Sequence, residues 1–154
     1  MHSRIFQVSR TPIETYDYIE EMDYIDHWFT NSVADYVSDN CNRNDDIEWL
    51  KQCRRGLAVD CDENGEYLMI TSKTEYFSHS FERFKKILNK IKDCTLEEFS
   101  EEGYVDMWGL KNEYEEKFGF YIDNDGDLNS LDSFVRRYEE GKKYYIGGTV
   151  DYHC

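Results

Sequence analysis

Hydrophobic positions along this chain follow two periods, one typical of strands and one typical of helices. Residues 4–8 (RIFQV) predict a short strand, which ends before Pro12 because proline cannot donate to a strand ladder. Residues 57–61 and 66–71 are rich in strand-forming residues, and the four residues between them predict a hairpin. A last strand, interrupted by two glycines, is predicted over residues 143–152.

Apolar residues at steps of three and four predict the helices. The clearest pattern covers residues 73–92, where Ser72 and Glu75 form a capping box ahead of an apolar stripe. The same spacing predicts a helix over residues 24–38. Capping residues and terminating glycines predict four shorter helices: from Asp45 to Gly56, from Thr95, from Asp106 to Gly119, and over residues 128–138.

These elements predict one α+β domain over residues 1–154, with a small, mainly antiparallel sheet and several packed helices. The longest helix, residues 73–92, is expected to pack on the sheet, and residues 120–122 suit either a strand or a loop. A chain of 154 residues can bury a core without disulfide or metal staples.

Charge divides the chain into three regions within a net charge of −15. Residues 14–48 hold eleven acids and one base, and residues 95–132 hold twelve acids and two bases. Between them, residues 73–92 carry six bases and two acids. A net negative charge is repelled by anionic membranes and disfavours direct binding to nucleic acid, so neither partner is expected.

Cysteine usage favours a reducing compartment. The five cysteines are an odd number without C-x-x-C spacing, and the first ten residues lack the apolar core of a secretory signal. No apolar run is long enough to cross a bilayer. We therefore expect a cytoplasmic protein with reduced thiols.

Two acidic stretches resemble parts of a calcium-binding EF-hand loop. Residues 60–65 begin with the right spacing, but the twelfth position is Thr71 instead of the glutamate that the ion requires. Around Gly126 the register also fails, because Tyr121 stands at the first ligand position. A hairpin turn is predicted at the first stretch, and at the second a loop in which Asp127 or Asn129 caps the next helix. No metal site and no cofactor are predicted.

The sequence gives catalysis no positive support. His27 has acidic neighbours, yet a surface ion pair explains them, and His79 lies on the polar side of its helix. Nucleotide-binding, hydrolase and zinc-protease motifs do not occur. An enzyme whose site is assembled from distant residues is the second alternative to the function predicted below.

The acidic blocks predict a non-catalytic protein that engages a basic protein partner. Uncompensated charge lowers stability but steers oppositely charged partners, and tyrosine adds apolar contact area at low entropic cost. The first alternative is a nucleic-acid mimic, in which carboxylates along helices imitate phosphates and occupy the groove of a DNA- or RNA-binding protein. The predicted partner-binding residues are Asp17, Tyr18, Glu20, Glu21, Asp23, Tyr24, Asp26, Asp35, Tyr36, Asp39, Glu97, Glu98, Glu101 and Glu102.

Overall fold

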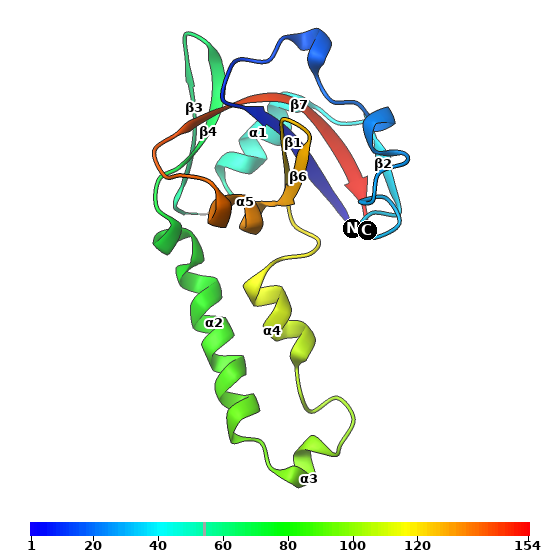
Figure 1. The fold of residues 1–154 in the computed structure, drawn as a ribbon, viewed down its shortest axis with the longest axis vertical. Helices are drawn as coiled ribbons and strands as arrows, with labels where there is room; N and C mark the ends of the chain where they lie inside the picture. Colours follow the sequence, from blue (N-terminus) through cyan, green and yellow to red (C-terminus); the bar gives the residue numbers. More distant parts are fainter. Residues whose placement is uncertain (54) are drawn as a thin grey trace.

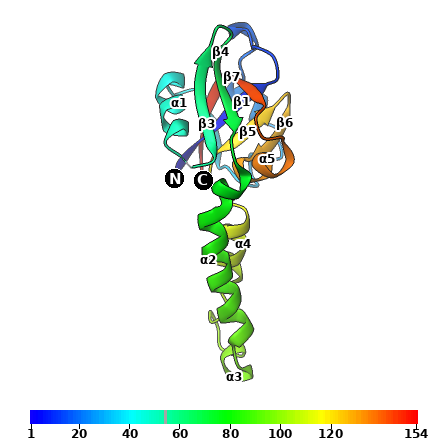
Figure 2. The ribbon, with the colours of Figure 1, turned by 90° about the vertical axis from the view of Figure 1, so that its left-hand side faces the viewer.

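The computed structural model describes residues 1–53 and 55–154, as a sheet body with a projecting helical arm (Figures 1 and 2). Over these residues seven strands form one sheet in the order β3-β4-β7-β1-β5-β6, with β2 also paired to β7. Every pairing is antiparallel except that of β1 with β5, which is parallel. The strands are β1 His2–Ser9, β2 Tyr36–Ser38, β3 Leu57–Asp62, β4 Gly65–Ile70, β5 Tyr121–Asn124, β6 Asp127–Ser130 and β7 Lys143–His153.

The helices begin at capping side chains. Ser72 caps α2, Thr95 and Glu98 form a capping box at α3, and Asp106 caps α4. Asn42 caps α1, three residues before the predicted Asp45. The helices are α1 Arg43–Lys51, α2 Lys73–Asp93, α3 Leu96–Phe99, α4 Met107–Tyr114 and α5 Leu131–Arg137, with 3-10 turns η1 Thr15–Asp17 and η2 Glu21–Tyr24. The predicted α+β class and mainly antiparallel sheet are confirmed, and the sheet is larger than predicted.

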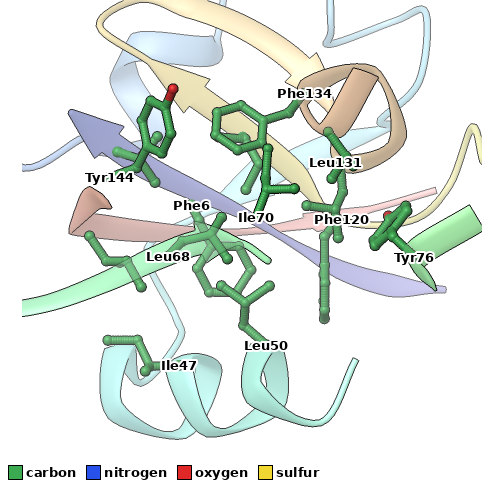
Figure 3. Packing of buried hydrophobic residues seen from close by; sticks show 14 residues of the cluster. Phe6, Ile47, Leu50, Leu68, Ile70, Tyr76, Phe120, Leu131, Phe134 and Tyr144 are labelled. Atoms are coloured by element: carbon green, nitrogen blue, oxygen red, sulfur yellow. The ribbon is translucent and has the colours of Figure 1, made fainter. Parts of the chain in front are cut away.

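The main core joins strands β1, β4, β5 and β7 to helices α1 and α5 (Figure 3). Its fully buried residues include Phe6, Leu68, Ile122 and Phe134. Burying a side chain of this size stabilises the fold by about 1.5–3 kcal/mol. A second core lies on the opposite face of the sheet, because Ile5 belongs to it while its neighbour Phe6 belongs to the first.

A bulge in β7 changes which face of the sheet its even-numbered side chains point to. The register with β1 shifts between Phe6 and Val8, opposite Gly147 and Gly148. Before the bulge Tyr144 and Ile146 point into the main core, and beyond it Val150 and Tyr152 point into the second core. One extra residue reverses the direction of every later side chain. Both cores are therefore filled by even-numbered residues of one strand.

The arm comprises residues 73–116, which include α2, α3 and α4. Tyr76 and Ser80 are the residues of α2 that are buried, and both lie in its first half. The rest of α2 extends away from the sheet beside α4 (Figure 2). The predicted packing of this helix on the sheet is therefore wrong beyond its first turns, since its later turns contact α4 instead.

The predicted helix over residues 24–38 is wrong. The chain turns at Phe29, whose carbonyl oxygen accepts the amides of Ser32, Val33 and Ala34 at 2.9–3.2 Å. Asn31 has a φ of 79°, outside the helical region. Residues 30–32 (TNS) favour turns because their side chains compete for backbone hydrogen bonds. The buried apolar residues of this segment reach the second core through turns, not from one helical face.

The prediction for residues 120–138 is partly wrong. Residues 127–130 form β6 instead of the start of a helix, and Ser130, not Asp127 or Asn129, caps α5. Between β5 and β6, Asp125 and Gly126 have φ values of 54° and 89°. Two positive φ values in a two-residue loop are typical of a type I′ hairpin, for which Asp-Gly is a favoured pair.

Candidate functional site

The acidic segment, residues 14–39, is the most strongly charged part of the body. It holds eight acids and neither lysine nor arginine. It includes η1, η2 and β2, along the upper right of the body in Figure 1. Its acids are Glu14, Asp17, Glu20, Glu21, Asp23, Asp26, Asp35 and Asp39.

The bulge of β7 positions this segment against the sheet. A Cβ atom on Gly148 would lie 2.9 Å from Cβ of Tyr18 and 3.0 Å from the backbone of Ile19, so only glycine allows this approach. Gln7 accepts the amides of Gly148 at 2.9 Å and Ile19 at 3.2 Å, and it donates to the Asp17 carbonyl at 2.8 Å. The sheet therefore holds the backbone of residues 17–19 directly.

Arg43, the base of the predicted first acidic block, is occupied elsewhere. Its guanidinium donates to the carbonyls of Gly147 at 2.7 Å and Ile146 at 2.8 Å, and it pairs with Glu66 at 3.1 Å. The Tyr18 ring lies 5.5 Å from it. Arg43 thus stabilises the bulge and leaves the carboxylates of the acidic segment uncompensated.

Backbone amides, not cationic side chains, hold several of these carboxylates. Asp39 accepts the Glu21 amide at 2.7 Å, and Glu21 accepts the Asp39 amide at 3.3 Å. Asp23 accepts the Glu20 amide at 2.9 Å within a capping box. Within residues 1–53 and 55–154, Asp35 is the acid of this segment that forms an ion pair, with His153 at 3.2 Å. The segment keeps its negative charge.

Large apolar side chains are exposed between these acids. Tyr16 is 82% exposed, Met22 68% and Trp28 54%, and Ile25 and Tyr36 are about half exposed. Charged groups that surround exposed aromatic residues are typical of a protein-binding surface. Tyr16, Met22, Ile25 and Trp28 were missing from the predicted site. The failed helix at residues 24–38 explains the last two, since it assigned them to a buried stripe.

The prediction is wrong for Tyr24, which is 1% exposed. Its ring lies in the second core, and its hydroxyl donates to buried Asp123 at 2.6 Å. Burial, with the charge of Asp123, raises the pKa of Tyr24 far above its ordinary value, so the hydroxyl stays protonated. Tyr24 therefore stabilises the fold beneath the acidic segment.

We expect Tyr24→Phe to lower the free energy of unfolding by about 1–3 kcal/mol, because the buried Asp123 carboxylate loses its hydroxyl donor. Urea unfolding measures the change. Tyr16→Phe is the matched control, since this exposed hydroxyl should matter by less than about 0.5 kcal/mol. Equal losses in the two variants would show that the bond to Asp123 contributes nothing.

The other two predicted tyrosines have partners on the body. Tyr18 is half-buried beside Arg43. Tyr36 stacks on the His153 ring, with centroids 5.3 Å apart and planes 4° apart, and it remains 47% exposed. Tyr36 can therefore still contact a partner, and Tyr18 can do so only with the part of its side chain that remains exposed.

The four predicted glutamates of the second block lie elsewhere. Glu97, Glu98, Glu101 and Glu102 are at or beside α3, the far end of the arm (Figure 1). Glu98 accepts the Thr95 amide, a hydrogen bond that lowers the pKa of its carboxyl. The structure therefore divides the predicted site into the acidic segment and the arm tip. Further acids of this block are buried in the body, among them Asp123 and Asp132.

Both stretches that resemble EF-hand loops are hairpin turns. Asp62 in the β3–β4 turn pairs with Lys143 at 2.5 Å and accepts the Asn64 amide at 2.8 Å. These bonds lower the pKa of the Asp62 carboxyl, with the Lys143 bond as the larger cause. In the β5–β6 turn, Asp123 accepts the Gly126 amide at 2.7 Å. The carboxylates of Asp62 and Asp123 thus stabilise the turns themselves.

A hollow of about 480 Å³ lies beside the chain ends, lined by residues 31–35 with Lys117, Phe118 and Cys154. Burial raises the pKa of the Cys154 thiol, so it stays protonated and is a weak nucleophile. Burial likewise raises the pKa of Cys41, which donates to the Thr149 carbonyl at 3.3 Å. These two thiols are therefore not activated for nucleophilic catalysis.

Every helix in the described part of the chain is too short or too polar to cross a membrane.

A scan against protein-family models, a search of curated proteins and a search of solved structures each found no match to this chain. The function is therefore inferred from the geometry alone.

Proposed function

We propose that this chain is a non-catalytic binding protein whose acidic segment engages a basic protein. The observation that supports this proposal is the pattern of residues 14–39, where eight acids and no lysine or arginine are interspersed along the chain with exposed Tyr16, Met22 and Trp28. Folding alone does not require such a surface, because unpaired like charges repel one another. A cationic partner would relieve that repulsion and cover the aromatic side chains.

The two parts of this surface have different roles in binding. Exposed carboxylates raise the association rate and select partners by charge, and salt weakens both effects. Exposed aromatic residues supply contact energy when a partner buries them. We therefore expect a partner that has lysine and arginine around an apolar patch. A reducing cytoplasm suits the free thiols of Cys41, Cys61, Cys94 and Cys154.

The helical form of nucleic-acid mimicry has less support. It needs carboxylates spaced along helices, but the acidic segment consists of two 3-10 turns, loops and a short strand. At the arm tip, α3 ends at Phe99, before Glu101 and Glu102. A mimic would be revealed if the captured partner proved to be a nucleic-acid-binding protein.

The proposal is tested by capture from lysate with the immobilised chain and two charge-matched variants. The segment variant carries Glu14→Gln, Asp17→Asn and Asp26→Asn, and the tip variant carries Glu97→Gln, Glu101→Gln and Glu102→Gln. We expect basic proteins that elute as salt rises, with affinity reduced roughly tenfold for the segment variant, since three charges at about 0.5 kcal/mol each give about 1.5 kcal/mol and about 1.4 kcal/mol is a factor of ten. The tip variant should retain them.

Because both variants lose three charges, the comparison separates a specific surface from net charge. Equal losses in both variants would mean that capture follows net charge alone. Capture that does not change with salt would remove electrostatics from the account. Either result would contradict the proposal.

A further inference from the structure

The arm has an apolar flank that the contact between α2 and α4 leaves uncovered. Phe81 and Leu88 of α2 are 55% and 44% exposed, and Met107 and Tyr114 of α4 are 58% and 54% exposed. Each pair is seven residues apart, so each lies along one side of its helix. The rings of Tyr114 and Phe84 are 6.5 Å apart, and Phe84 lies three residues after Phe81 and four before Leu88, so the side of α2 that carries this pair adjoins α4 at Tyr114.

A hollow between α2 and the segment that precedes α4 adds to this flank. It measures about 360 Å³ and is lined mainly by Ile87, Ile91, Tyr104 and Val105. Two of the most exposed apolar side chains of the chain lie at the nearby tip, Leu96 at 84% and Phe99 at 65%. The arm therefore has an apolar hollow, and it also has exposed apolar side chains that could fill the same hollow on another copy.

Both signs of charge are present on the same arm. Residues 73–92 have a net charge of +4, and residues 93–116 hold nine acids and one base. Arg83 pairs with Glu113 at 2.7 Å across the seam. In the described residues no ion pair involves Lys85, Lys86, Lys90 or Lys92. These lysines are available to acids from outside the chain.

The root of the arm is fastened to the body. The guanidinium of Arg136 on α5 lies between the rings of Phe77, at 4.3 Å, and Tyr114, at 4.1 Å. Asp132 accepts the Tyr76 hydroxyl and the Glu116 amide, each at 2.8 Å. These contacts hold α2 and α4 in place, so association would order little additional chain.

We propose that the arm is a dimerisation element whose occupant is a second copy of this chain, packed antiparallel about a two-fold axis. A two-fold interface must be self-complementary. The arm meets that requirement, because within the described residues no ion pair involves these four lysines of α2 or Glu97, Glu101 and Glu102 at the tip. Each tip then lies along the partner's α2, where its glutamates neutralise the partner's lysines.

Charge also favours the antiparallel direction. The arm has a net charge of −4, and the remaining residues have −11. Parallel arms would bring two strongly negative bodies together, whereas antiparallel arms hold them at opposite ends of the dimer.

The arm is large enough for a specific interface. The 21-residue α2 is roughly 31 Å long, and the arm is roughly 20 Å wide because α4, α3 and the chain between them run beside α2 (Figure 1). One face of the arm therefore offers roughly 600 Å² per copy, or about 1,200 Å² in total, which is at the lower end of the range for specific interfaces.

The test is the mass of the protein in solution, measured by sedimentation equilibrium over a range of concentrations. We expect a concentration-dependent dimer with twice the chain mass of 18.5 kDa. Leu88→Glu should raise the dimer dissociation constant at least tenfold, because it places a charge in the apolar centre of the interface. Trp28→Ser, in the acidic segment, is the control that should leave the dimer unchanged, and circular dichroism verifies that both variants fold.

A charge exchange tests the pairing without relying on an apolar position. One variant carries Lys85→Glu and Lys86→Glu, and the other carries Glu101→Lys and Glu102→Lys. Each alone should dissociate at least tenfold more readily than the wild type, and an equimolar mixture should regain part of the lost affinity as a heterodimer.

A monomer at every concentration would overturn the proposal, as would open polymers or a mixture that regains nothing. This inference does not depend on the proposed function of the acidic segment. A wild-type chain that stays monomeric and still captures a basic protein would reject the inference and leave the proposed function intact.

Discussion

Replacing Asp46 with alanine is expected to lower the free energy of unfolding by about 2–4 kcal/mol, because Arg4 loses one of its two carboxylate partners and Thr149 loses its hydrogen-bond acceptor. Asp46 lies in α1 and is 3% exposed. It pairs with Arg4 at 2.6 Å and accepts the Thr149 hydroxyl at 2.8 Å. Asp151 also pairs with Arg4, and it pairs with His2 at 2.9 Å. The substitution therefore disturbs a network that joins β1, β7 and α1.

Denaturant unfolding measures this effect, and Asp45→Ala is the matched control. Asp45 is the preceding residue of the same helix turn and is exposed, so its loss should cost less than about 1 kcal/mol. Similar losses for the two variants would show that the network contributes little to stability.

Gly56→Ala should destabilise the fold by about 2–4 kcal/mol, through a strained φ and a steric clash. Gly56 has a φ of 79°, and an added Cβ atom would lie 2.6 Å from the Tyr76 amide nitrogen and closer still to the Ser72 carbonyl oxygen. Both neighbours belong to the start of α2, the root of the arm. The backbone cannot yield there without moving α2.

Gly141→Ala separates the two causes. Gly141 has a φ of 73°, and an added Cβ atom would have no contact within 4 Å among the residues that the structure describes. This control suffers the strain alone and should lose about 1–2 kcal/mol. A Gly56 variant no less stable than the Gly141 variant would refute the close contact at the arm root. Thermal unfolding of the two variants makes the comparison.

Local signals in the sequence predicted most of the elements. Strands β1, β3, β4 and β7 form where alternating and β-branched residues indicated them, and α2 begins at the predicted Ser72 cap. Hairpin chemistry would also have revealed β5 and β6, because Asp125-Gly126 is a favoured type I′ pair.

Tertiary placement could not be predicted in the same way. The apolar stripe of α2 would suit packing on a sheet or on another helix equally well, since periodicity does not identify the neighbour. At residues 24–38 the spacing of apolar residues matched a helix, but the turn preference of residues 30–32 prevailed. The burial of Tyr24 could therefore not be predicted, because the residues around it in the sequence indicated a helix that does not form.

The acidic segment was only partly visible in the sequence for a related reason. Its charges are contiguous in the chain, so counting predicted them. Its exposed Tyr16, in contrast, precedes residues 17–19, whose backbone the bulge of β7 and Gln7 position, and its exposed Trp28 lies where turns replace the predicted helix. The glutamates of the arm tip were predicted to belong to the same site only because they are also acidic, and the fold places them far from the acidic segment.

Hydrogen exchange of the chain, with and without a captured basic protein, tests the central claim most directly. The acidic segment has few sheet or helix hydrogen bonds, so its amides should exchange rapidly in the free chain. We predict that the partner slows exchange within residues 14–39 and leaves the amides of β5 and β6 unchanged. Slowed exchange confined to other parts of the chain, with residues 14–39 unaffected, would contradict the account.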